Sequence, residues 1–180
     1  ASLLNRSFVL MVGTVEPRKG YDFALKSFER MWRGGNSEPA VGIVGKPGWQ
    51  TRGVQRKLNA HRTAGASLFW LENADDSQLG WLYDNAGLLL AASLDEGFGL
   101  PISEALSRSL PVLANDIPPF REFNSSNIEF MTYNDVEGAV RQVRAMMGKE
   151  RIASHPPCQR PEWRETAMEI LEHMGLVARI

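Results

Sequence analysis

Short apolar runs alternate along the chain with longer amphipathic segments. Six runs are apolar at nearly every position, which is typical of strands buried on both faces of a parallel sheet. Between them apolar residues recur at helical spacing, as at Phe23, Ala24, Phe28 and Met31. The predicted strands are residues 8–13, 40–45, 66–71, 88–92, 111–114 and 128–131, and the predicted helices are residues 20–32, 54–64, 77–86, a segment opening near Pro101, and 135–147.

This alternation predicts an α/β fold with a doubly wound, parallel, six-stranded sheet and helices on both faces. Right-handed crossovers bring the carboxyl ends of all strands to one edge, where ligands bind in such folds. Ser77 is the predicted N-cap of the third helix. The loops expected at the ligand edge are residues 13–19, 45–50, 71–76, 93–100 and 115–121.

The carboxyl-terminal part of the chain is expected to lie outside this alternation. Residues 148–161 include Pro156 and Pro157 and predict a linker, and residues 163–174 predict an amphipathic helix. We therefore expect one domain over residues 1–155. Residues 156–180 are expected to form a linker and a helix that packs on this domain or on a preceding one.

Composition narrows the classes of function. The net charge of -1 provides no overall field that would favour nucleic acid or an anionic membrane. The single Cys158 excludes an internal disulfide, and three scattered histidines predict no metal cluster, so a reducing, cytoplasmic setting fits best. The sequence has no apolar run of the roughly 20 residues that span a bilayer, and its start lacks the features of a signal peptide.

Residues 96–104 are the strongest candidate for a functional site. Glu96 and Glu104 bracket a turn containing Gly97 and Gly99, which follows a buried strand and runs into a helix with Pro101 in its first turn. A helix N-terminus presents unpaired N–H groups and a positive dipole end, so phosphate is the natural ligand. The alternatives are a plain tight turn and a Glu104 that merely complements the helix dipole.

Charged and apolar residues on the neighbouring loops extend this candidate site. Arg18 and Lys19 precede the helix at residues 20–32, where the dipole disfavours cations and a bound phosphate would resolve the conflict. Lys46 follows the second strand and would meet phosphate or base, and Leu71 ends the third strand, where a base would lie. The alternatives are that Arg18, Lys19 and Lys46 are solvated surface charges, and that the end of the third strand packs in the core.

The run E-G-F-G-L-P-x-x-E at residues 96–104 resembles the E-x7-E signature of family 4 retaining glycosyltransferases, in their carboxyl-terminal, donor-binding domain. These enzymes have the two-domain glycosyltransferase B fold, and the chain resembles its Rossmann-like carboxyl-terminal half. The resemblance extends from about residue 8 to residue 173. Further matching segments are residues 12–20, 44–49, 79–86, 110–112, 116–122 and 163–167.

The resemblance implies a role for each candidate residue. Glu104 would bind the ribose hydroxyls of a nucleotide sugar, and Glu96 the hydroxyls of the donor sugar. Lys19 would bind the diphosphate. Many family members carry an arginine directly after the glycine equivalent to Gly13, where this chain has Thr14, so Arg18 is expected to supply the guanidinium. The backbone of Gly97, Phe98, Gly99 and Leu100 would contact sugar and phosphate, with Gly13, Thr14, Lys46 and Leu71 completing the donor site.

The implied activity is transfer of a hexose, with retention, from a nucleotide-diphosphate sugar to a saccharide or lipid-linked acceptor. The expected donor is GDP-mannose and the expected context bacterial surface polysaccharide synthesis, with no metal or other cofactor and no nucleic-acid partner. The acceptor would bind an amino-terminal domain that this chain lacks, so the chain alone is expected to be inactive. The full-length enzyme would associate peripherally with the cytoplasmic face of the membrane. The alternatives are a non-catalytic nucleotide-sugar binding module and a glycosyltransferase B-type epimerase, whereas a nicotinamide-dependent enzyme is disfavoured because G-x-G-x-x-G is missing after the first strand.

Overall fold

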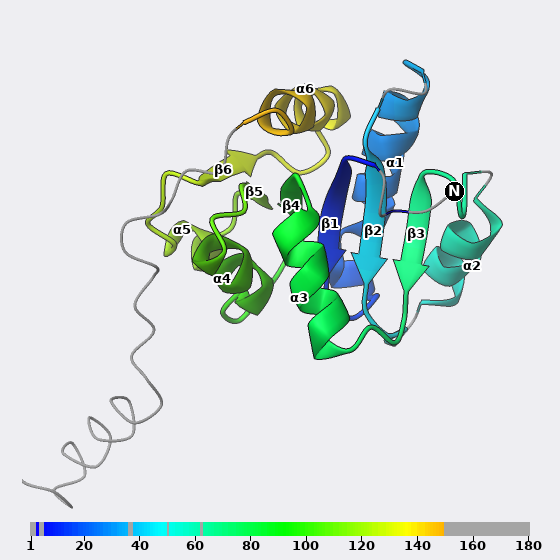
Figure 1. Ribbon diagram of the computed structural model, residues 1–180, viewed down its shortest axis with the longest axis horizontal. Helices are drawn as coiled ribbons and strands as arrows, with labels where there is room; N and C mark the ends of the chain where they lie inside the picture. The colour runs from blue at the N-terminus through cyan, green and yellow to red at the C-terminus, as the bar shows by residue number, and fades with distance from the viewer. Residues whose placement is uncertain (1–2, 4–5, 36–37, 50, 62, 150–180) are drawn as a thin grey trace, which may run out of the picture.

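The structure is a computed structural model that describes residues 3, 6–35, 38–49, 51–61 and 63–149. Its centre is a six-stranded, all-parallel sheet with the strand order β3-β2-β1-β4-β5-β6 (Figure 1). The predicted doubly wound sheet is therefore confirmed. The strands are β1 (Phe8–Val12), β2 (Ala40–Val44), β3 (Leu68–Leu71), β4 (Leu88–Ala91), β5 (Val112–Asn115) and β6 (Ile128–Met131).

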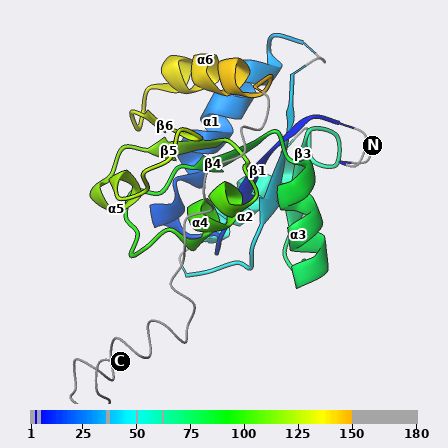
Figure 2. The same ribbon diagram turned by 60° about the vertical axis from the view of Figure 1, so that its left-hand side comes forward.

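Helices cover both faces of the sheet, so the molecule has three layers. Figures 1 and 2 show α3 and α4 on one face and α1 on the other, with α6 lying beside α1. The helices are α1 (Tyr21–Trp32), α2 (Arg52–Ala60), α3 (Asp76–Asn85), α4 (Leu100–Ser107), α5 (Pro118–Arg121) and α6 (Val136–Met146), and a short 3-10 helix, η2, spans Pro17–Lys19.

Two apolar cores, one on each side of the sheet, hold these layers together. On the first side Phe28 and Met31 of α1 pack with Val143 of α6 against the sheet, and all three are at most 2% exposed. Their spacing is the helical spacing seen in the sequence. On the other side Tyr83 of α3 and Ile102 of α4 are buried against the opposite strand face. Burial on both faces explains the nearly continuous apolar character of β1, β2 and β5.

The strand order reverses between β1 and β4, and this junction positions the site. β1 pairs with β2 from Phe8 to Val12, while its register with β4 places Val9 opposite Leu88 and Leu10 opposite Leu89. The chain leaves β1 and β4 in opposite directions along the sheet, which creates a crevice between their carboxyl ends. The loops that follow β1 and β4 therefore meet.

Several predicted boundaries are wrong by a few residues. The helix predicted over residues 54–64 begins at Arg52 and ends at Ala60, because the chain then turns, with the Ala64 N–H donating to the His61 carbonyl. Three further N–H groups, from residues 66–68, donate to the Thr63 carbonyl, so β3 begins at Leu68 rather than residue 66.

The N-cap of α3 is Asp75, not the predicted Ser77. The Asp75 carboxylate accepts a hydrogen bond from the Gln78 N–H at 2.8 Å, and the Gln78 side chain accepts from the Asp75 N–H at 3.1 Å. Ser77 instead donates to the Asp75 carboxylate. The predicted loop at residues 115–121 also contains α5, whose first turn suits two prolines because they need no N–H partner there.

The predicted domain boundary near residue 155, the linker and the helix at residues 163–174 all fall outside the described residues, and these stay predictions. Within the described part of the chain, every helix is too short or too polar to cross a membrane. The same part contains no group of three or more histidine, cysteine, aspartate or glutamate side chains that could hold a metal ion.

Candidate functional site

The site lies where the loop after β1 meets the loop after β4. Backbone atoms join the two loops directly, since the Leu94 N–H donates to the Arg18 carbonyl at 2.7 Å. The Arg18 guanidinium adds a second bond, from Nη1 to the Asp95 carbonyl at 3.1 Å. The segment that carries Lys19 is therefore fixed against the segment that carries Glu96.

Glu96 is the centre of a charged cluster between these loops. Lys19 Nζ donates to Glu96 Oε1, and Ser93 Oγ donates to the same oxygen at 2.9 Å. The side chains of Lys19 and Glu96 are each 12% exposed. Arg18 Nη1 approaches Glu96 Oε2 at 3.4 Å, while its Nε donates to Glu16 at 2.9 Å. The structure thus brings together Lys19, Arg18 and Glu96, the residues expected to bind the diphosphate and the donor sugar.

The cluster keeps Glu96 ionised. Burial raises the pKa of Glu96, but the hydrogen bonds from Lys19 and Ser93 and the charges of Lys19 and Arg18 lower that pKa further than burial raises it. The carboxylate is therefore an acceptor for hydroxyl donors at neutral pH.

Gly20 holds Lys19 in this position. It ends η2 and precedes α1 with φ of 72°, in the left-handed region. A Cβ at Gly20 would overlap the carbonyl oxygen of Ala92 and lie 2.9 Å from its carbonyl carbon. The first loop therefore packs on the backbone that leads from β4 to Ser93, and any side chain at Gly20 would push the two loops apart.

The N-terminus of α4 provides unpaired donors beside the charged cluster. Among the described residues, none accepts a hydrogen bond from the backbone N–H groups of residues 97–100. The Phe98 and Leu100 side chains are 54% and 57% exposed, so the turn faces solvent. Gly99 packs on the Phe120 ring, which a Cβ would meet at 2.9 Å. A crevice of about 20 Å³, space for about one water molecule, lies between this turn and the ends of β1 and β4, and Lys19, Glu96 and Gly99 help to line it.

Glu104 lies apart from the Glu96 cluster, at the contact between α4 and α3. Its Oε2 accepts a hydrogen bond from the Tyr83 hydroxyl at 2.8 Å. The Arg108 guanidinium carbon lies 5.9 Å from the centre of the Tyr83 ring, and Arg108 is ion-paired with Asp84 at 2.7 Å. Glu104 is thus held by a neighbouring helix rather than by Lys19 or Arg18.

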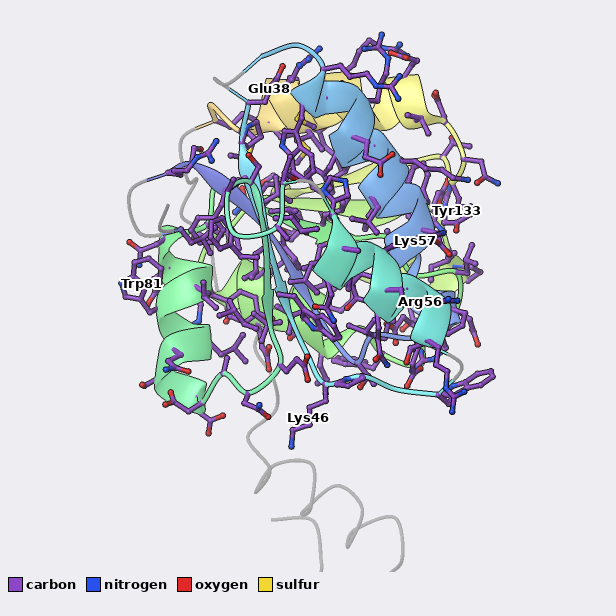
Figure 3. All side chains as sticks on the ribbon, turned by 90° about the vertical axis from the view of Figure 1, so that its right-hand side faces the viewer. Glu38, Lys46, Arg56, Lys57, Trp81 and Tyr133 are labelled. Carbon is purple, nitrogen blue, oxygen red and sulfur yellow. The ribbon has the colours of Figure 1, made fainter. Side chains whose placement is uncertain are left out.

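The remaining residues predicted to contact the ligand are found at the carboxyl ends of β1, β2 and β3. Gly13 accepts a hydrogen bond from the Tyr21 hydroxyl at 2.7 Å, and burial raises the pKa of Tyr21, so the hydroxyl keeps its proton. Thr14 is exposed. Lys46 is also exposed and extends away from the body of the protein (Figure 3). Leu71 is 37% exposed at the end of β3, and its carbonyl accepts from the Gly45 N–H at 3.1 Å.

Three residues of this region were missed by sequence reasoning. Ser93 follows β4 at the ligand edge and could have been identified from its position and its hydroxyl. Tyr21 and Tyr83 lie in helices, where an aromatic residue at an apolar position predicts core packing. Nothing in the spacing along the chain shows that their hydroxyls reach Gly13 and Glu104.

Known proteins resemble this chain in sequence and in fold. The chain is 34% identical over 172 residues to the serotype-specific mannosyltransferase WbdA of Escherichia coli. The aligned part is 94% of this chain and 21% of that protein. It is 29% identical over 117 residues to the O-antigen chain mannosyltransferase B of Escherichia coli. Here the aligned part is 65% of this chain and 30% of that protein. The chain therefore spans about a fifth to a third of the length of these relatives.

The fold also resembles that of a solved structure. The UDP-forming α,α-trehalose-phosphate synthase from Burkholderia xenovorans superposes with a TM-score of 0.70 at 14% identity, over 83% of this chain and 37% of that one. At this identity the likeness concerns the fold alone. The family model described as glycosyl transferases group 1 matches residues 2–158. The chain, with its parallel sheet and its paired loops after β1 and β4, therefore belongs to the glycosyl transferases group 1 family.

Proposed function

We propose that this chain is the donor-binding domain of a retaining glycosyltransferase of family 4 and that it binds a nucleotide-diphosphate sugar. The observation that supports this most directly is the contact of Lys19 with Glu96. In a sugar nucleotide the sugar and the diphosphate share one oxygen. Groups for sugar hydroxyls and for phosphate must therefore lie side by side, as the Glu96 carboxylate and the Lys19 ammonium do.

Each part of the donor has a matching group at this edge. Lys19, Arg18 and the N–H groups of residues 97–100 would bind the diphosphate, because they are cations and unpaired donors beside a helix N-terminus. Glu96 would accept hydrogen bonds from the sugar hydroxyls, and Glu104 from the ribose hydroxyls. The base would lie toward Leu71 and Lys46, on the loops after β3 and β2.

The same groups would favour bond cleavage. When the bond between the sugar and the diphosphate breaks, negative charge grows on the leaving phosphate, and fixed cations stabilise that charge without reorganising. Arg18 and Lys19 supply this positive charge, so the proposal includes no metal ion. Glu96 would position the sugar rather than attack it, and the acceptor would be held by a part of the enzyme outside this chain.

The donor we propose is GDP-mannose, for a saccharide or lipid-linked acceptor in bacterial surface polysaccharide synthesis. The two relatives named as mannosyltransferases, one of them an O-antigen chain enzyme, support this choice. A cytoplasmic location suits a chain of 180 residues with a single cysteine. A lipid-linked acceptor would place the longer enzyme at the cytoplasmic face of a membrane as a peripheral protein.

Calorimetry on the 180-residue chain tests this proposal. GDP, UDP, ADP and dTDP are titrated separately into folded protein, with and without EDTA. We expect GDP to bind most tightly and EDTA to leave its affinity unchanged. A folded sample that binds none of the four nucleotides contradicts the proposed function, and tighter binding of another nucleotide contradicts the choice of donor. Transfer assays on an enzyme that contains this domain then separate a transferase from a binding module.

A further inference from the structure

The contact between α3 and α4 contains a buried hydroxyl aimed at Glu104. Tyr83 is 2% exposed, and its hydroxyl donates to Glu104 Oε2 at 2.8 Å. We propose that Tyr83 is a positioning residue for nucleotide binding, which orients the Glu104 carboxylate so that its other oxygen faces the ribose hydroxyls. This inference rests on the proposed function, because it assigns Glu104 a ribose to bind.

The chemistry of the pair fixes which group donates. Burial raises the pKa of Tyr83, and the hydrogen bond to Glu104 raises that pKa further, so the phenol keeps its proton at any physiological pH. A carboxylate offers about four acceptor positions on two oxygens. Tyr83 occupies Oε2, and no described residue donates a hydrogen bond to Oε1, so Oε1 can accept one from a ligand hydroxyl.

The Tyr83 ring is itself held on several sides, which makes it a firm support. It belongs to the core between α3, α4 and the sheet. The Arg108 guanidinium lies over the ring, and the Asp84 carboxylate holds Arg108 in turn. Asp84 and Tyr83 are on α3, whereas Glu104 is on α4 and Arg108 is the C-cap residue directly after it, so two contacts tie α3 to α4 and its carboxyl end.

The benefit of such a support is preorganisation. A glutamate side chain has several rotatable bonds, and fixing it when a ligand binds costs conformational entropy. A carboxylate that is already held by Tyr83 avoids part of that cost. The gain applies to the ribose hydroxyls and not to the diphosphate or the base, and this difference allows a test that general damage to the fold cannot imitate.

The test measures discrimination between ribose and deoxyribose by the 180-residue chain. GDP, 2′-deoxy-GDP and 3′-deoxy-GDP are titrated into the wild type and into Tyr83→Phe, which removes one oxygen and keeps the buried ring. The wild type should prefer GDP over at least one deoxy analogue. For Tyr83→Phe we expect GDP binding to weaken about tenfold, the lower part of the effect of a hydrogen bond to a charged group. Binding of that analogue should stay nearly unchanged.

Two further variants separate positioning from structure. Tyr133→Phe is the matched control, because the Tyr133 ring packs on Phe23 and its hydroxyl makes no hydrogen bond with the described residues. In a Glu104→Ala background, Tyr83→Phe should change GDP affinity by less than about twofold, because residues that act through one another are non-additive. Glu104→Asp, which withdraws the carboxylate by one methylene, should reproduce the loss of discrimination even if Tyr83→Phe does not fold.

The outcomes distinguish this inference from the proposed function. If the wild type binds GDP and a folded Tyr83→Phe keeps its affinity and its preference for ribose, the positioning role is wrong and the proposed function stands. If Glu104→Asp also keeps that preference, the ribose role of Glu104 is wrong and the inference fails with it. If Tyr83→Phe weakens all three nucleotides equally, or does so in the Glu104→Ala background as well, Tyr83 is only structural. If the wild type binds no nucleoside diphosphate, the inference and the proposed function fail together.

Discussion

Replacing Gly20 by alanine tests whether the two loops of the site are held together as the structure shows. Gly20 combines a left-handed backbone with direct packing on the Ala92 carbonyl. Gly65 offers a matched control, because its φ of 74° is nearly the same as the 72° of Gly20 and a Cβ there would have no neighbour within 4 Å. Alanine at Gly65 therefore carries the backbone cost alone, whereas alanine at Gly20 adds the clash.

The two costs can be estimated separately. A left-handed conformation costs an L-residue about 1–2 kcal/mol, and the lower entropy of the unfolded chain returns about 0.4–1 kcal/mol. Gly65→Ala should therefore destabilise by about 1 kcal/mol. Overpacking adds about 1–3 kcal/mol, so Gly20→Ala should destabilise by about 2–4 kcal/mol in total.

Urea titrations give the free energies of unfolding by linear extrapolation. For a chain of this size 1 kcal/mol lowers the melting temperature by about 2–4 °C, so Gly20→Ala should melt about 5–15 °C below the wild type. GDP affinity should fall in Gly20→Ala, because Lys19 moves away from Glu96, and should persist in Gly65→Ala. If the two variants lose the same stability within about 0.5 kcal/mol, Gly20 does not pack on Ala92 as described, and the reasoning fails.

Three further measurements address the charged cluster and the cap of α3. Lys19→Met should weaken GDP binding about tenfold or more, because a charge-assisted contact to phosphate is lost, while Lys26→Met on the exposed face of α1 should leave calorimetric affinity unchanged. Because the folded pKa of Glu96 lies below its ordinary value of 4.5, its ion pairs stabilise the fold above pH 4.5 and less as the pH falls through the folded pKa. The difference in unfolding free energy between wild type and Glu96→Gln should therefore shrink on acidification, and a difference that grows would refute the cluster. Asp75→Ala should cost about 1 kcal/mol in urea titrations and Ser77→Ala clearly less, since only Asp75 accepts from the N–H of Gln78; the reverse order would contradict the assigned cap.

The order of strands and helices could be predicted from the sequence because burial on both faces gives inner strands a distinctive pattern. β1, β2, β4 and β5 were each located within a residue or two. The end of α2 and the start of β3 are predicted less closely. Hydrogen bonds between residues 61 and 68 fix these two boundaries, and no apolar pattern in the sequence records such bonds. The prediction misplaces the cap of α3 because Asp75 and Ser77, two positions apart, are both good cap residues, and only the reciprocal bonds of Gln78 distinguish them.

The site was predictable in its location and less so in its internal contacts. Topology alone places Lys19 and Glu96 at neighbouring strand ends, so their proximity follows from the strand order. That they contact each other, with Ser93 as a third member, depends on the turn after β4 and was not foreseen. Tyr83 and Glu104 are 21 positions apart and lie on different helices, so local spacing along the chain does not reveal their hydrogen bond. The assigned ligand roles of all these residues stay predictions.

The bond from the Leu94 N–H to the Arg18 carbonyl has a consequence for how such a site can be altered. It joins main chain to main chain, so it survives replacement of either side chain. We expect positions 14 and 18 to tolerate many residues while the loop after β1 keeps its shape, provided that Gly20 and the loop length are unchanged. A library randomised at Thr14, with Arg18 kept for the diphosphate, is therefore a practical route to new donor preferences, whereas insertions in this loop would detach Lys19 from its partner.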